Sequence, residues 1–258
     1  TAAALLMQEW FPHISMWIWT IVFAIIIFGL NISSTRIFAE SEFWLALVKV
    51  ITVIAFIILG LLAIFGLIPF HGSESAPLFH NLTAHGWFPQ GLVPIFTTML
   101  IVNFAFSGTE LIGVAAGETK NPAENVPKAI NAAIWRLLIF FVGTIIVISA
   151  LLPFQVAGLG GEGVSSSPFV TVFKYIGIPY ADDIIRFVII TALLSAANSG
   201  LYAASRMMWS LSDQRQLPSI FSKLSKSGTP IIAIIVTMFG AIPGLLSEHF
   251  APETIFKN

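Results

Sequence analysis

Long apolar stretches separated by short polar connections run along the whole chain. A transmembrane α-helix needs about 20 consecutive, mainly apolar residues to cross a hydrocarbon core about 30 Å thick. The stretches that meet this requirement are 14–34, 43–68, 91–117, 132–154, 183–211 and 230–246. The pattern therefore predicts an all-α, polytopic integral membrane protein. We expect residues 1–258 to form a single transmembrane domain truncated at both ends, with further spans represented by an apolar stub before the first stretch and a tail after the last.

Composition supports a lipid environment for this chain. Hydrophobic residues make up 57% of the sequence and charged residues only 10%, whereas soluble domains are about 25% charged. No water-soluble fold could bury that much apolar surface. The expected partner is therefore the lipid bilayer, and a net charge of −1 gives no indication of a nucleic-acid partner. The absence of cysteine excludes disulfides and thiolate metal sites, and no pattern predicts a metal or another cofactor.

Basic residues alternate between the two sides of the predicted spans. Lys and Arg near span ends accumulate in cytoplasmic connections. The connections at 35–42, 118–131 and 212–229, with the span ends beside them, hold most of the basic side chains: Arg36, Lys49, Lys120, Lys128, Arg136, Arg206, Arg215, Lys223 and Lys226. The opposite side has only Lys174, Arg186 and Lys257. This bias predicts that those three connections are cytoplasmic, in a protein of the plasma (inner) membrane.

The span 91–117 contains a carboxylate and a glycine inside an apolar segment. Glu110 follows Gly108 and Thr109 there, and an acidic residue at a helix centre costs about 2.5 to 3.5 kcal/mol to insert. Glycine allows the backbone to leave the helix, which would expose carbonyls and amides to a ligand. Two interpretations remain: a broken helix that binds a substrate, or a kink whose Glu110 bonds to a neighbouring helix.

A polar stripe follows the span 183–211. Ser195, Asn198 and Ser199 recur at helical spacing and must face protein or water rather than lipid. They could line a transport pathway. Alternatively, small and hydroxylated side chains allow helices to approach closely and to bond across their interface.

The segment 104–129, which contains Gly-Thr-Glu-Leu-Ile-Gly at 108–113, resembles the sixth helix and following loop of the amino-acid permeases. These belong to the amino acid-polyamine-organocation superfamily. That hexapeptide and Lys-Val-Ile-Thr-Val at 49–53 look most like the bacterial lysine-specific permeases, and residues 195–206 match the family's eighth helix. The resemblance therefore runs along essentially the whole chain.

The resemblance implies a leucine-transporter-like fold of two inverted five-helix repeats, of which the six spans would be helices four to nine. It places the substrate on the sixth helix, with Phe104 as the gating aromatic and Glu110 near the substrate's amino groups. The unwound backbone would be Ala105, Phe106, Ser107, Gly108 and Thr109. Ser107 departs from the glutamine common in lysine permeases, which affects the choice of substrate more than the class.

Lys49 is the position that the resemblance implies for proton coupling. Proton-coupled members have a lysine in the fifth helix, where sodium-coupled relatives bind their ion. Burial lowers a lysine pKa and a nearby carboxylate raises it, so such a lysine can load and release a proton. The alternative is that Lys49 extends to the cytoplasmic interface and has no coupling role.

The resulting hypothesis is a secondary active transporter that imports lysine or another cationic amino acid with a proton by alternating access. A neutral amino acid is the alternative substrate. A membrane-embedded enzyme or a sensor is a more remote alternative, because the spans contain no paired carboxylates, no histidine and no nucleophile with an evident base. The chain is therefore not expected to be an enzyme.

Overall fold

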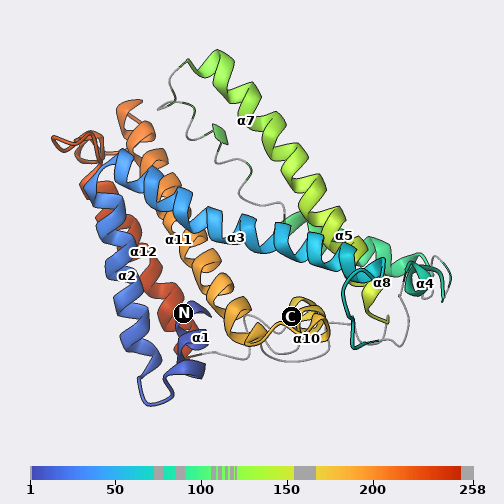
Figure 1. Ribbon diagram of the computed structural model, residues 1–258. Helices are drawn as coiled ribbons and strands as arrows, with labels where there is room; N and C mark the ends of the chain where they lie inside the picture. The colour runs from blue at the N-terminus through green and yellow to red at the C-terminus, as the bar shows by residue number, and fades with distance from the viewer. Residues whose placement is uncertain are drawn as a thin grey trace. The chain divides into compact units, whose positions relative to one another are not determined.

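Helices form the ordered elements of the computed structural model (Figure 1). It describes residues 2–72, 78–84, 86, 91–105, 109, 112–113, 116, 119, 121–153 and 167–250. Within them the α-helices are α1 (Ala2–Trp10), α2 (Met16–Ser33), α3 (Thr35–Ile64), α4 (His80–Thr83), α5 (Val93–Ala105), α7 (Pro122–Leu137), α8 (Gly143–Leu151), α10 (Pro168–Ile176), α11 (Ala181–Asp213) and α12 (Ile231–Phe250). A π-helical segment, Leu138–Val142, joins α7 to α8, and a 3₁₀ turn covers Ser219–Ser222.

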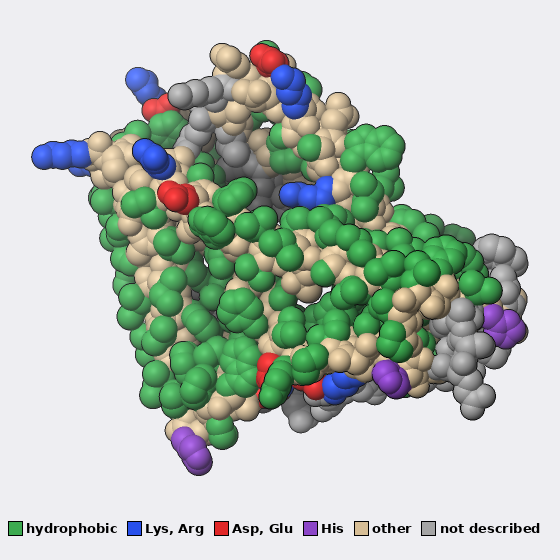
Figure 2. Space-filling model, viewed as in Figure 1, with side chains coloured by type: hydrophobic (Ala, Val, Ile, Leu, Met, Phe, Trp, Pro, Cys, Tyr) green, Lys and Arg blue, Asp and Glu red, His purple; other side chains and the backbone are tan. Residues whose placement is uncertain are grey.

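Four helices of the described residues are long and apolar enough to cross a membrane. They are α2, α3, α11 and the continuous helix Pro122–Leu151. Helices α3 and Pro122–Leu151 have 30 residues each, and α11 has 33. These lengths correspond to about 45 to 50 Å of helix. Large apolar side chains such as Ile18 and Ile25 are more than half exposed, and hydrophobic side chains cover most of the visible face along α2 (Figure 2). An apolar surface of this extent is typical of contact with lipid.

Two connections predicted as loops are in fact helical. Residues 35–42 form the first turns of α3, and only Ser34 interrupts the helix between α2 and α3. Ser34 is extended, and its Oγ accepts a hydrogen bond from the Ile37 N–H at 3.2 Å, so it caps α3 at once. The polar residues after it end the apolar run but not the helix, because glutamate, alanine and arginine are all good helix formers.

The connection 118–131 is helical from residue 122 onward, where α7 begins. Asn121 has a left-handed backbone with φ 49° and ψ 62°, and Pro122 occupies the first turn, where its missing N–H costs nothing. Pro127 lies within the helix near its start. The predicted connection 212–229 agrees better, because α11 ends at Asp213 and α12 begins at Ile231.

Contacts divide the chain into two compact units, residues 1–48 with 189–258 and residues 49–188. In the first unit α2 contacts both α1 and α12. Its core is built on Ile27, Leu201 and Ile234, with Leu194 and Met238 packed against them. In Figure 1, α2, α12 and the later part of α11 run side by side in this unit.

A stacked pair of aromatic rings outside this core also connects helices of the first unit. The Phe38 ring lies 4.2 Å from that of Tyr202 in a stacked geometry. The Arg206 guanidinium lies 5.1 Å from the centre of the Tyr202 ring and donates to Thr35 Oγ1 and to the Gly228 carbonyl, both at 3.3 Å. Arg206 therefore ties α11 to the start of α3 and to the segment before α12.

The second unit is held by close packing and a few polar contacts. Phe56 of α3 is fully buried, with its ring 4.5 Å from Phe169 and 5.5 Å from Phe173 of α10. Asn81 Nδ2 donates to the Ala150 carbonyl of α8 at 2.8 Å. Since an unpaired polar group is costly in an apolar interior, such bonds hold the short α4 in place.

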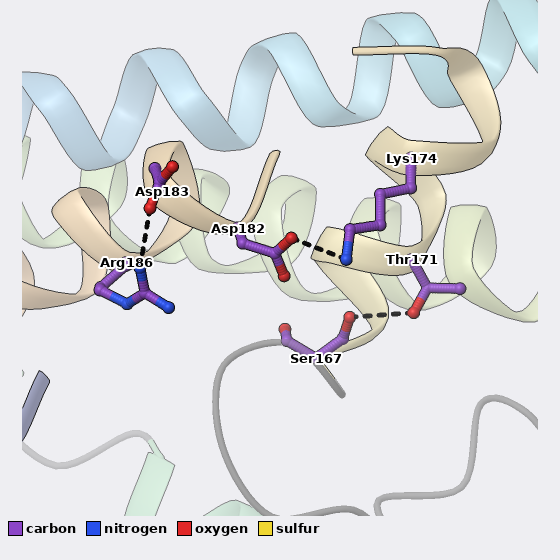
Figure 3. Close-up of polar contacts among 6 residues, drawn as sticks. All are labelled: Ser167, Thr171, Lys174, Asp182, Asp183 and Arg186. Atoms are coloured by element: carbon purple, nitrogen blue, oxygen red, sulfur yellow. Dashed lines mark hydrogen bonds and ion pairs between the residues drawn. The ribbon is translucent and has the colours of Figure 1, made fainter. Parts of the chain in front are cut away.

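Ion pairs fix the turn between α10 and α11 (Figure 3). Lys174 Nζ lies 2.7 Å from Asp182 Oδ2, and Arg186 Nη1 lies 2.8 Å from Asp183 Oδ1. Asp182 and Asp183 belong to the first turn of α11, where negative charge is favoured by the unpaired N–H groups of the helix end. These pairs have a structural explanation, and we assign them no ligand.

Candidate functional site

A buried polar network joins three helices within the first unit. Asn198 of α11 donates through Nδ2 to Glu42 Oε2 of α3 at 3.2 Å, and the Ser195 hydroxyl donates to Glu42 Oε1. Asn31 of α2 donates through Nδ2 to Asn198 Oδ1 at 2.8 Å, and also to the Ile27 carbonyl at 3.0 Å. We call these four residues, Asn31, Glu42, Ser195 and Asn198, the Glu42 network.

Three of the four residues of the Glu42 network are buried. Asn31, Ser195 and Asn198 are 4%, 1% and 0% exposed, and Glu42 is half-buried. Donors and acceptors match, because an ionised carboxylate only accepts hydrogen bonds and each Glu42 oxygen receives one. Helix geometry explains how α11 reaches both oxygens, since residues three apart lie on the same face. The arrangement holds an ionisable group at a point where three apolar helices meet.

A cavity of about 260 Å³ adjoins this network. Helices α2, α3 and α11 all contribute to its wall, which includes Asn198, Ser41 and Trp44. Most of the wall is apolar, from side chains such as Leu30 and Leu194. Asn198 therefore belongs both to the hydrogen-bonded network and to the wall of this partly open, apolar cavity.

The structure separates the predicted pathway residues into two kinds. Ser195 and Asn198 belong to the Glu42 network, whereas Ser199 is half-buried one position further along α11. Lys49 is half-buried near the middle of the 30-residue α3. It follows Glu42 on that helix by seven residues, about 10 Å along the axis. Its role in proton coupling stays a prediction.

The predicted substrate segment falls largely outside the described residues. Phe104 and Ala105 are the last residues of α5, described in their backbone only. Thr109 lies in a turn and is exposed. Phe106, Ser107, Gly108 and Glu110 lie outside the described part of the chain. The binding role of these seven residues stays a prediction.

Sequence reasoning missed Glu42 and Asn31. Glu42 is the last residue of the predicted connection 35–42, directly before the apolar stretch 43–68, and was not singled out from the sequence. Its distance of seven residues from Lys49 is a helical repeat that could have placed both on one face of α3. Asn31 had a weaker signal, as a lone amide near the end of an apolar span.

The long helices expose apolar side chains, and the ionisable Glu42 is hydrogen-bonded between three of them. These features are typical of a polytopic membrane protein, in which polar side chains face other helices rather than lipid. The sequence model of the amino acid permease family, described as "Amino acid permease", matches residues 1–258. The chain belongs to this family, and the resemblance noted in its motifs is confirmed.

Individual permeases are similar along nearly the whole chain. A putative histidine permease of Bacillus subtilis is 49% identical over 99% of this chain and 53% of its own length. Amino-acid permease RocC of the same species is 48% identical over 99% of this chain and 54% of its length. The lysine-specific permease LysP of Escherichia coli is 41% identical over 99% of this chain and 52% of its length. The chain therefore spans about half the length of the curated relatives it matches.

Proposed function

We propose that a protein containing this chain imports a cationic amino acid, with lysine the first choice, together with a proton across the plasma membrane. The observation that carries the proposal is the match to the amino acid permease family over residues 1–258. The proposed mechanism is alternating access between two inverted five-helix repeats, to which this chain contributes helices four to nine. The proposed activity is transport rather than catalysis.

The substrate site that we propose is the segment Phe104–Glu110. In such a site the broken helix offers backbone groups to the substrate's α-ammonium and carboxylate, and Glu110 pairs with the cationic side chain. Charge-assisted hydrogen bonds of this kind are roughly twice as strong as neutral ones. The named relatives support a substrate with an amino group, because they include a putative histidine permease and a lysine-specific permease.

A neutral amino acid is the second candidate within the same class. The identity to the putative histidine permease, at 49%, exceeds the 41% to LysP, so the lysine assignment depends on motifs rather than on overall similarity. In the neutral case Glu110 would contact only the α-ammonium. Connections 35–42, 118–131 and 212–229 are proposed to face the cytoplasm in either case.

Uptake of radiolabelled lysine tests the proposal directly. The full-length permease that carries this sequence is reconstituted in liposomes with an imposed proton gradient, and every other amino acid is added as a competitor. Gradient-driven lysine uptake with competition only by cationic amino acids is the expected result. Accumulation of a neutral amino acid with no lysine uptake would reject the substrate, and no uptake of any amino acid would reject the transporter function.

Glu110→Gln distinguishes the two substrate classes. If Glu110 binds the cationic side chain of the substrate, the rate of lysine uptake in this variant falls by about 10-fold or more. The reason is that losing one charged hydrogen bond costs about 1.5 to 3 kcal/mol. Uptake of a neutral competitor, where one exists, stays near the wild-type rate. An equal loss for both substrates would instead place Glu110 at the shared α-ammonium.

Lys49→Met tests the proposed proton coupling. The side chain of methionine has a length similar to that of lysine and carries no proton. We expect the variant to lose proton-driven accumulation, and a variant that still accumulates lysine against its gradient would exclude Lys49 as the coupling residue.

A further inference from the structure

The hydrogen bonds around Glu42 suit both protonation states of its carboxyl group. In the ionised state both oxygens accept, Oε1 from the Ser195 hydroxyl and Oε2 from Asn198 Nδ2. When Oε1 takes up a proton, it becomes a donor, and a serine hydroxyl can turn from donor to acceptor. The displaced Ser195 hydrogen then has the usual partner of a helical serine, the carbonyl four residues earlier, which is that of Thr191. Asn198 continues to donate to Oε2.

The charge on Glu42 is not balanced by an ion pair among its described contacts. Helix α2 contributes Asn31 and has no ionisable side chain, and the α11 residues that touch Glu42 are the neutral Ser195 and Asn198. Charged neighbours on its own helix are Arg36, Glu40 and Lys49. Gain or loss of a proton at Glu42 therefore changes the net charge of the helix junction.

Glu42 is half-buried rather than sealed. The adjoining cavity of about 260 Å³ is lined by residues of α2, α3 and α11, including Ser41 and Asn198, but its surface is almost entirely apolar. An apolar cavity does not hold ordered water by itself. The exposed part of the Glu42 side chain is therefore the route by which a proton can enter and leave the carboxyl group.

We propose that Glu42 is a proton-exchanging group of the transport cycle, in addition to Lys49; this inference rests on the proposed proton-coupled function. Because connection 35–42 is proposed to face the cytoplasm, Glu42 lies near the cytoplasmic end of its span; its carboxylate takes up a proton that arrives along the transport pathway and becomes a neutral carboxylic acid. It later returns that proton to water on the cytoplasmic side. Protonation replaces two charge-assisted hydrogen bonds by weaker neutral ones, so α3 is held less tightly to α11 while the proton is bound.

Three variants of the full-length permease test this inference. Glu42→Gln keeps the shape and cannot exchange a proton, whereas Glu42→Asp keeps an ionisable group. Glu40→Gln is the matched control, because Glu40 is exposed and lies two residues away on the same helix. Each protein is reconstituted and compared with wild type in two assays, gradient-driven accumulation and counterflow exchange without a gradient, using the amino acid that the wild type takes up.

For Glu42→Gln we expect accumulation to fall by a factor of about 5 to 150, the usual range of coupling between two sites, while counterflow stays within about twofold. The dependence of uptake on external pH should flatten in this variant. Glu42→Asp should keep a pH-dependent accumulation, and Glu40→Gln should behave as wild type in both assays.

Two results would overturn the inference while leaving the proposed function intact. If the Glu42→Gln variant accumulates substrate as well as the wild type and keeps the same pH dependence, Glu42 does not carry the proton. Loss of counterflow as well as accumulation in both Glu42 variants would show a purely structural role. If the wild type itself accumulates no amino acid under the gradient, the proposed function fails first, and the role of Glu42 falls with it.

Discussion

At the scale of single residues, buried polar side chains determine how α2, α3 and α11 meet. Asn198 is fully buried and is the central member of the Glu42 network, because it accepts from Asn31 and donates to Glu42. The sequence left two interpretations of the polar stripe on α11, a pathway or a bonded helix interface. The contacts of Ser195 and Asn198 are those of a bonded interface, and the proton exchange proposed for Glu42 would add a transport role to it.

Asn198→Leu should destabilise the protein. Leucine has a similar shape but no hydrogen-bonding groups, so Glu42 Oε2 and Asn31 Nδ2 each lose a partner. We expect a loss of about 1 to 3 kcal/mol in the free energy of unfolding, measured by thermal unfolding in detergent. Ser199→Ala, one position along α11, is the control and should change it by less than about 0.5 kcal/mol. Equal stabilities for the two variants would contradict the importance of Asn198.

At the scale of elements, the helices continue beyond their apolar stretches. Helix α3 begins at Thr35, because Ser34 caps it directly after α2, and α7 begins at Pro122, far ahead of the predicted span 132–154. Hydropathy reports where a chain meets lipid, whereas hydrogen bonding and turn residues decide where a helix ends. Helix packing adds a second requirement, for small residues where two helices approach closely.

Gly60→Ala should destabilise the second unit by overpacking. Gly60 is buried on α3, and a Cβ built there would overlap Cγ1 of Val147 on α8. Such overpacking costs about 1 to 3 kcal/mol, again measured by thermal unfolding in detergent. Gly29→Ala on α2 is a matched control, since a Cβ there meets nothing within 4 Å. We expect it to be neutral or to stabilise by up to about 1 kcal/mol, the helix-propensity difference between the two residues.

At the scale of the whole molecule, the distribution of basic residues predicts how the chain is inserted. The six spans, the single transmembrane domain and the cytoplasmic position of connections 35–42, 118–131 and 212–229 stay predictions. The chain has no cysteine, so a single introduced cysteine is the only thiol within these residues. This makes the orientation directly measurable.

Ser227→Cys and His71→Cys test the orientation as a pair. Both positions are exposed, Ser227 in the segment before α12 and His71 after α3. A membrane-impermeant maleimide should label His71→Cys in intact cells and Ser227→Cys only in inside-out vesicles. The reverse pattern would invert the topology, and labelling of both from one side would show that the number of spans between them is wrong.

The helical class, the membrane environment and the permease family were all predictable from the sequence. The length of each apolar stretch and the motif around Gly108–Glu110 are local features of the sequence. They can be recognised without knowing which residues meet in space. Helix starts at Thr35 and Pro122 were not predicted, because a hydropathy pattern does not distinguish polar residues in the first turns of a helix from a loop. Ser195 and Asn198 of the Glu42 network stood out in the sequence as part of a polar stripe, whereas Glu42 and Asn31 did not, and the pathway role of Ser195 and Asn198 stays a prediction.

The sequence by itself therefore determined which solvent surrounds the helices, since hydropathy and charge placement are additive properties of residues. Only the tertiary structure decided which polar side chains meet, because Asn198 on α11 lies 167 residues from Asn31 on α2 and 156 residues from Glu42 on α3. Their pairing depends on the rotation and packing of α2, α3 and α11, and burial then makes each unpaired polar atom costly enough to select this arrangement.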